Sequence, residues 1–288
     1  MTSTGTEASE PERPTGTAAT ATATHPGGVD APHRARIGLR TLRKDRYWVV
    51  PTFTVIGLSA WVIYATVRVF LQNNYWVAEH HYLTPFYSPC VSNGCIPESA
   101  HFGRVLVDNP IIPYAAFSLP FLLLFRLTCY YYRKAYYRSF WLSPPACAVP
   151  DRHKSYTGET KFPLILQNSH RYFFYAAFII TLINTYDAIL AFSGEDGFGI
   201  GLGNLILIGN VVMLWGYTLS CHSCRHVTGG RLRNFSKNPI RYRWWTFVSR
   251  LNTRHMQYAW ITLGTLALTD FYIMALAAGW FDDLRFIN

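Results

Sequence analysis

The sequence predicts an all-α membrane protein, a bundle of five transmembrane helices with a cytoplasmic N-terminus and an external C-terminus. Three observations support this fold class. Of the 288 residues, 50% are hydrophobic, 16% are aromatic and only 15% are charged, which is too apolar for an ordinary soluble domain. Several apolar windows have the length, roughly 20 residues, that a helix needs to cross a bilayer. The basic residues are concentrated in alternate connecting segments.

The elements follow in chain order. Residues 1–35 are rich in Thr, Ala, Pro and Gly and have almost no large apolar side chain, so we expect a disordered cytoplasmic tail. Residues 36–288 should form the five-helix transmembrane domain. Its spans are predicted at about residues 48–70, 111–131, 172–192, 198–220 and 256–280. In the second span, Pro113 and Pro120 predict a kink or a locally opened helix.

The distribution of basic residues predicts the orientation. Seven Lys/Arg precede the first span, eight lie in the loop after the fourth, and the loop after the second is also basic. The opposite side has only Arg104 and Arg285 in its exposed segments. This asymmetry predicts a multi-pass protein of the cell membrane with both basic loops in the cytoplasm. There the net charge of +10 can meet anionic membrane lipid or an acidic partner. Nucleic acid is excluded as a partner, because no recognition fold accompanies the basic stretches.

The six cysteines divide between the two sides. Cys90 and Cys95 fall in the long external loop, where an oxidising environment and an Asn-Gly pair between them favour a small disulfide loop. Four others, Cys129, Cys147, Cys221 and Cys224, fall on the cytoplasmic side, where thiols stay reduced and can bind metal.

The segment from Cys221 to His226 contains two thiols and two imidazoles. If the fourth helix continues to Gly229-Gly230, Cys221 and Cys224 share one face, while His222 and His226 share a different one. One small cluster cannot easily use all four side chains, so further ligands must come from other helices.

Two histidines at the starts of other spans are at about the same depth. His170 and His255 immediately precede the third and fifth spans. We therefore predict a metal site formed by Cys221, Cys224, His170 and His255. Two thiolates and two neutral imidazoles are the ligand set of a Rieske-type [2Fe–2S] cluster, whose raised potential suits electron donation to a quinone.

Other uses of these residues stay open. Structural zinc would use the same four ligand types. A single haem b near the cytoplasmic surface could be held by His170 and His255, although no histidine lies in the middle of a span to hold a haem deep in the bundle. A further alternative is Cys129 or Cys147 with the pair His222 and His226.

Two carboxylates lie in the outer half of the predicted membrane region. Asp187 and Asp270 are in the third and fifth spans, where burying an ionisable group is costly, and Tyr272 lies beside the second of them. One interpretation is a proton relay or a polar pocket for quinone. The other is a polar residue close to the external interface.

Four stretches together carry a family resemblance: Arg126–Arg138, Phe162–Tyr175, Ser220–Gly230 and Leu251–Trp260. The chain resembles, over roughly residues 40 to 275, the membrane-anchor subunit of an actinobacterial succinate dehydrogenase, the single-anchor form of respiratory complex II. The resemblance implies a flavoprotein subunit and an iron–sulfur subunit docked on the cytoplasmic face. Electrons from succinate, a substrate of the tricarboxylic acid cycle, would pass through the anchor to a membrane quinone.

The resemblance also bears on the cofactor. Single-anchor relatives have five spans and haem b held by histidines inside the helices. This chain keeps the span count but departs from that ligand pattern, in agreement with the subclass that carries a Rieske-type cluster. The anchor itself would not act on succinate, since nothing in it resembles a flavin or dicarboxylate site. The quinone could bind beside the cluster or further out, near Asp187 and Asp270.

Overall fold

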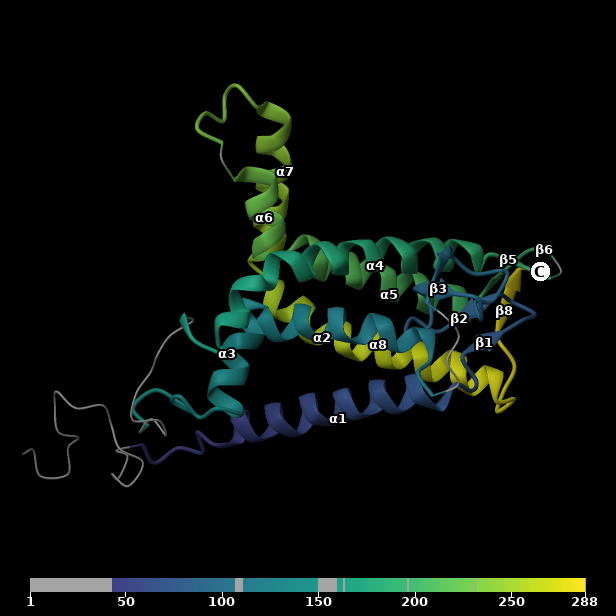
Figure 1. Ribbon diagram of the computed structural model, residues 1–288, viewed down its shortest axis with the longest axis horizontal. Coiled ribbons are helices and arrows are strands. Elements are labelled where there is room, and N and C mark those ends of the chain that lie inside the picture. Colours follow the sequence, from purple (N-terminus) through teal and green to yellow (C-terminus); the bar gives the residue numbers. More distant parts are fainter. Residues whose placement is uncertain are drawn as a thin grey trace, which may run out of the picture.

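A computed structural model describes residues 43–106, 111–149, 160–162, 164–195, 197–230 and 232–287. Long helices lie side by side in a bundle (Figure 1). Four of those described are long and apolar enough to cross a membrane: α1 (Val49–Leu71), α4 (His170–Leu190), α5 (Leu202–Leu219) and α8 (His255–Ala277). A bent helix pair brings the number to as many as five if it forms one span. The predicted tail, residues 1–35, lies outside the described residues.

The bent pair replaces the predicted second span. A 3₁₀ helix, η1 (Tyr114–Phe117), leads into α2 (Ser118–Thr128), and α3 (Tyr130–Ser139) follows after a bend of 79°. The kink predicted at the prolines is displaced, because both prolines lie at or near the beginning of this segment, where a missing N–H costs little. The bend is at Cys129, whose backbone is extended.

A second break separates α5 from α6 (His222–Gly229). Cys221 is the N-cap of α6, with φ −63° and ψ 143°, and its Sγ accepts a hydrogen bond from the Ser223 N–H at 3.3 Å. The expectation that the fourth helix continues to Gly229-Gly230 is therefore wrong. Helix α6 and helix α7 (Pro239–Asn252) form a helical hairpin. The hairpin projects from the bundle across the direction of the long helices (Figure 1).

The two ends of the bundle differ. One end, here called the hairpin end, holds α3, α6, α7 and the start of α4, which follows the 3₁₀ helix η3 (Leu164–Ser169) (Figure 1). The other, here called the strand end, holds short two-stranded sheets. Their strands are β1 (Trp76–Val77) with β2 (Tyr82–Leu83), β3 (Cys90–Ser92) with β4 (His101–Leu106), β5 (Ser193–Gly194) with β6 (Gly197–Phe198), and β7 (Ile200–Gly201) with β8 (Arg285–Ile287). All pairs are antiparallel except β3–β4.

Side chains from the strand-end loops close that end of the bundle. The Tyr82 hydroxyl lies 2.8 Å from both Asn204 Oδ1 and Asp283 Oδ2. A Cβ at position 203 would meet the Tyr82 ring at 2.3 Å, so this close approach requires Gly203. A disulfide joins Cys90 to Cys95, with a Cα–Cα distance of 5.8 Å.

The helices differ in burial. Of the four long helices, α8 is the most buried and α1 the least. The exposed side chains of α1 are largely apolar, including Phe53, Ile56 and Ile63. An apolar outer surface on a helix of this length suits contact with lipid.

Candidate metal centre

The N-terminal ends of four helices meet at the hairpin end. Cys129 is the N-cap of α3 and Cys221 is the N-cap of α6, while α4 begins at His170 and α8 begins at His255. All four side chains line one pocket of about 160 Å³, together with Thr128, Tyr130, Arg133, Gln167 and His222. Helix N-termini carry partial positive charge, so this arrangement favours thiolates or an anionic group in the pocket.

The donor atoms of these four residues face one another in pairs. His170 Nε2 lies 3.1 Å from Cys221 Sγ, and His255 Nε2 lies 3.3 Å from Cys129 Sγ. Each Nε2 atom therefore faces a thiol of the pocket.

The second nitrogen of each imidazole is held by a hydroxyl. His170 Nδ1 lies 2.8 Å from Thr128 Oγ1, and His255 Nδ1 lies 2.7 Å from Ser220 Oγ. A hydrogen bond at one ring nitrogen fixes the ring orientation and the tautomer of a histidine ligand. Both hydroxyls belong to the residue directly before a cysteine, so the same two breaks supply thiols and hydroxyls.

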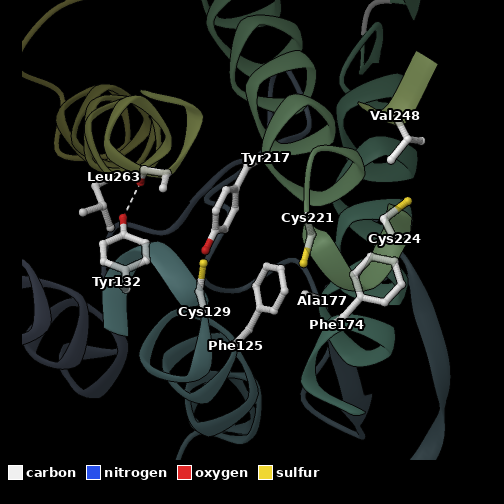
Figure 2. Packing of buried hydrophobic residues seen from close by; sticks show 11 residues of the cluster. Phe125, Cys129, Tyr132, Phe174, Ala177, Tyr217, Cys221, Cys224, Val248 and Leu263 are labelled. Carbon is white, nitrogen blue, oxygen red and sulfur yellow. Dashed lines mark hydrogen bonds between the residues drawn. The ribbon is translucent and has the colours of Figure 1, made fainter. Parts of the chain in front are cut away.

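Aromatic rings support both imidazoles. Phe125 stacks on His170 with ring centroids 5.2 Å apart and an interplanar angle of 2°, and Tyr217 stacks on His255 at 5.0 Å and 15°. The Tyr217 hydroxyl lies against the Cys129 thiol (Figure 2). The imidazole rings thus have little freedom to rotate, as expected of a preorganised site.

The thiols are not ionised by their surroundings alone. Burial raises the pKa of Cys221 to about 12 and that of Cys224 to about 11. At neutral pH, each becomes a thiolate only when a positive charge such as a metal ion stabilises it.

The pocket differs in one position from the predicted ligand set. His170, His255 and Cys221 line it, but Cys224 does not. Cys224 is buried between α6 and its neighbours, and Figure 2 shows its sulfur pointing away from Cys221. Cys221 lies at the break between α5 and α6, whereas Cys224 lies within α6. Cys129 lies in the pocket instead.

The remaining alternatives lie at or beyond the rim. His222 is exposed at the edge of the pocket, stacked on Tyr131, and His226 contacts Arg171 outside it. Cys147 is exposed and does not line the pocket.

The pocket has room for a small cluster. In the described part of the chain, no three His, Cys, Asp or Glu side chains surround one position ready to hold one ion. A volume of about 160 Å³ corresponds to roughly five water molecules at liquid density. Two irons and two bridging sulfides fit such a space, with thiols and imidazoles as the ligand types that a Rieske centre uses.

A much larger cavity, of about 850 Å³, adjoins this pocket. Its walls are almost entirely apolar and come from α1, α2, α3, α4, α5 and α8. Polar side chains at its hairpin end include Arg126, Tyr132 and Tyr217. Phe125 and Tyr217 line this cavity and also stack on the two imidazoles. One aromatic ring on each side therefore separates the cavity from the candidate metal ligands.

Arg126 carries a positive charge to the wall of this cavity. Its guanidinium donates to the Tyr132 hydroxyl and the Ala259 carbonyl, both at 3.0 Å, and lies 4.8 Å from the centre of the Tyr217 ring. Among the described residues, no carboxylate pairs with it. Arg126 and its partners therefore form a polar group at the hairpin end of the large apolar cavity.

Comparison with known proteins identifies the family. Residues 49–279 match the family model of the actinobacterial succinate dehydrogenase subunit SdhC. The chain belongs to this family. It is also similar to a chain of the Mycobacterium smegmatis Sdh1 complex in the apo form, with 68% identity, a TM-score of 0.82, and coverage of 90% of this chain and 98% of that one. No curated relative matches the chain. This protein is thus a membrane subunit of a succinate dehydrogenase.

The two carboxylates of this SdhC-family subunit bind protein groups at the strand end. Asp187 accepts hydrogen bonds from the Ser88 hydroxyl and, at 2.7 Å, from the Ala100 N–H. Asp270 accepts one from the Tyr64 hydroxyl at 2.6 Å and forms a buried ion pair with Arg68, whose Nε lies 2.7 Å from Oδ2.

Tyr272 donates a hydrogen bond to Asp283 at 2.6 Å. On one helix, Asp270 is about 22 Å from His255. None of these three side chains lines either pocket. Arg68 was not predicted from the sequence as the partner of Asp270, although a basic residue within an apolar span is itself a signal for a buried partner.

Proposed function

We propose that this subunit relays electrons from the soluble part of succinate dehydrogenase to a membrane quinone through a Rieske-type [2Fe–2S] centre. The proposed ligands are Cys129, Cys221, His170 and His255. The observation that carries the proposal is that these four side chains line one pocket. Cys129 replaces Cys224 in the predicted set, because Cys129 lines the pocket and Cys224 does not.

When bound, such a centre supplies one-electron transfer at a potential raised by its imidazole ligands. The protein supplies the rest. Thr128 and Ser220 hold the Nδ1 atoms, so that both Nε2 atoms face the pocket. The helix N-termini around the pocket offset negative charge on the ligands. Phe125 and Tyr217 cover the imidazoles on the side of the large cavity and keep water from them.

We place the hairpin end in the cytoplasm and the strand end outside. In support, α1 begins at the hairpin end, directly after the basic N-terminal segment, and the basic loop after α5 is also there. The Cys90–Cys95 disulfide then lies on the external, oxidising side. The flavoprotein and iron–sulfur subunits would dock at the hairpin end, next to the proposed centre. The similar Mycobacterium smegmatis chain comes from an Sdh1 complex, which supports such partners.

The large cavity is the proposed quinone site. Its apolar length suits an isoprenoid tail, and the Arg126 guanidinium offers a hydrogen-bond donor to a quinone carbonyl at the end next to His170 and His255. The Tyr132 hydroxyl, which donates to the Ala259 carbonyl, accepts from Arg126 and helps to hold it there. Asp187 and Asp270 are a less favourable location, because both are already bound by protein donors far from the proposed centre. Their proposed role is to fasten the strand-end loops and α1.

Structural zinc is a second candidate function for the pocket. The sulfur–nitrogen separations of 3.1 and 3.3 Å are short enough for each Cys–His pair to share one ion. A zinc site predicts stoichiometric zinc and quinone reduction that survives ligand substitution once the fold is intact.

The test replaces His170 and His255 by Ala in the purified complex. The proposal predicts loss of quinone reduction, while succinate oxidation with a soluble artificial acceptor persists. Iron, acid-labile sulfide, zinc and haem are measured in parallel. A reduced-haem absorption band, or quinone reduction that is unchanged in the variant, would contradict the proposal.

A further inference from the structure

The hairpin of α6 and α7 is a tightly packed unit. A Cβ at position 229 would meet the Trp245 ring at 2.1 Å, so Gly229 allows the two helices to approach closely. The Arg225 guanidinium covers the same ring at 5.1 Å, and Arg241 Nε donates to the Thr228 carbonyl at 3.1 Å. The hairpin is therefore a firm projection and not a loose loop.

One face of α7 is apolar and uncovered. Ile240, Trp244 and Phe247 are spaced i, i+4 and i+7, so they form one stripe along the helix. Their exposed fractions are 71%, 56% and 45%. We call these three residues the α7 stripe. Large apolar side chains grouped on one helix face indicate a contact surface.

The charge of this region has one sign. Residues 221–254 contain eight Lys/Arg and neither Asp nor Glu. Arg243 and Arg250 are exposed, and at 100° per residue both lie along the same edge of the α7 stripe. Among the described residues, neither has an acidic partner. The stripe is thus bordered by free positive charge.

The direction of the hairpin favours a membrane surface as its partner. Figure 1 shows it leaving the hairpin end across the direction of the long helices. If these helices cross the bilayer, the hairpin lies along its surface. A helix in that plane buries an apolar stripe among acyl chains, keeps Trp at the headgroup level and places Arg beside phosphates.

We propose that the α7 stripe and its border of Arg243 and Arg250 form an interfacial anchor that binds anionic phospholipid. The identity of the leaflet rests on the sidedness proposed above, whereas lipid binding itself does not depend on the metal centre or on quinone. The anchor would hold the start of α6, and with it Cys221, at a fixed depth next to the soluble subunits.

The first test locates the stripe in the assembled complex. Nitroxide labels are attached at Ile240→Cys and, as a reference in the connecting loop, at Ser236→Cys, both with the exposed Cys147 replaced by Ser. The complex is placed in bilayers of equal phosphatidylglycerol and phosphatidylcholine. The label at 240 should collide with dissolved oxygen and be shielded from a water-soluble nickel chelate. A label accessible to the chelate, or shielded from both reagents by a protein partner, overturns the proposal.

The second test concerns the charge. The paired substitution Arg243→Gln with Arg250→Gln should lower the preference for phosphatidylglycerol over phosphatidylcholine, measured by native mass spectrometry of the complex, by about fivefold for each arginine. The matched variant, Arg243→Lys with Arg250→Lys, should keep that preference. An unchanged preference in the Gln variant would overturn the role of the arginines. Because the metal content is measured on the same samples, a failure of this proposal is distinguishable from a failure of the proposed centre.

Discussion

The buried ion pair between Arg68 and Asp270 ties α1 to α8 and gives a sharp prediction. The side chains are 5% and 1% exposed, and their closest atoms are 2.7 Å apart. Replacing Asp270 by Ala leaves the guanidinium buried without its carboxylate, next to the Asn73 and Asn74 carbonyls at 3.4 and 3.2 Å. Breaking one partner of such a pair costs about 3–5 kcal/mol. For a unit of this size, we expect a fall in Tm of about 6–20 °C.

The assay is thermal unfolding of the purified complex, together with quinone reduction per intact complex below the transition. The control is the double variant Arg68→Met with Asp270→Leu, which removes both charges and should recover most of the lost stability, because no buried charge is left unpaired. Quinone reduction should persist in both variants, since Asp270 lines neither pocket. The reasoning is refuted if the double variant is as unstable as Asp270→Ala, or if quinone reduction stops in a folded complex.

Three further predictions concern the cavity, the centre and the external loop. Tyr217→Phe removes a hydroxyl that lies against Cys129, so the midpoint potential of the proposed [2Fe–2S] centre should fall by ~40 mV in a redox titration while the iron content stays constant. An unchanged potential would show that the Tyr217 hydroxyl does not interact with the cysteine ligand. Arg126→Gln should raise KM for quinone by about tenfold or more without changing succinate oxidation by a soluble acceptor. The KM of Arg126→Lys should lie between that of the native protein and that of Arg126→Gln. Equal KM values in all three proteins would show that Arg126 is not part of the quinone site. Replacing both Cys90 and Cys95 by Ser should lower the free energy of unfolding by about 2 kcal/mol, seen as a lower Tm. Adding a reductant to this variant should not lower the Tm further. A further fall would show that the reductant acts on a bond other than Cys90–Cys95.

The spans were predictable because they depend on composition and length alone. The third and fifth windows, 172–192 and 256–280, lie within a few residues of α4 (His170–Leu190) and α8 (His255–Ala277). A continuous apolar run of this length has few alternatives in a membrane.

The two helix breaks, unlike the spans, were not predictable from composition and length. Neither break has a Gly or Pro at its centre, and the only local sign is a hydroxyl residue, Thr128 or Ser220, before each cysteine.

The residues of the candidate site were predictable when their depth in the membrane was sufficient to place them together. They were not predictable when the placement depended on which face of a helix a side chain occupies. His170, His255 and Cys221 followed from their shared position at span ends. Cys224 was chosen by assuming a continuous helix, and Cys129, which lines the pocket, was expected only as an alternative together with His222 and His226. The partner of Asp270 was also hidden, because Arg68 is 202 residues away in the chain. Such contacts come from tertiary packing, which periodicity does not describe.

The central claim is tested most directly by comparing Cys129→Ser with Cys224→Ser in the purified complex. Acid-labile sulfide and iron are counted, and the electron paramagnetic resonance spectrum of the reduced complex is recorded. We predict that Cys129→Ser lacks the Rieske-type signal and two irons per complex, while Cys224→Ser keeps both. Loss of the signal in Cys224→Ser with retention in Cys129→Ser would contradict the account.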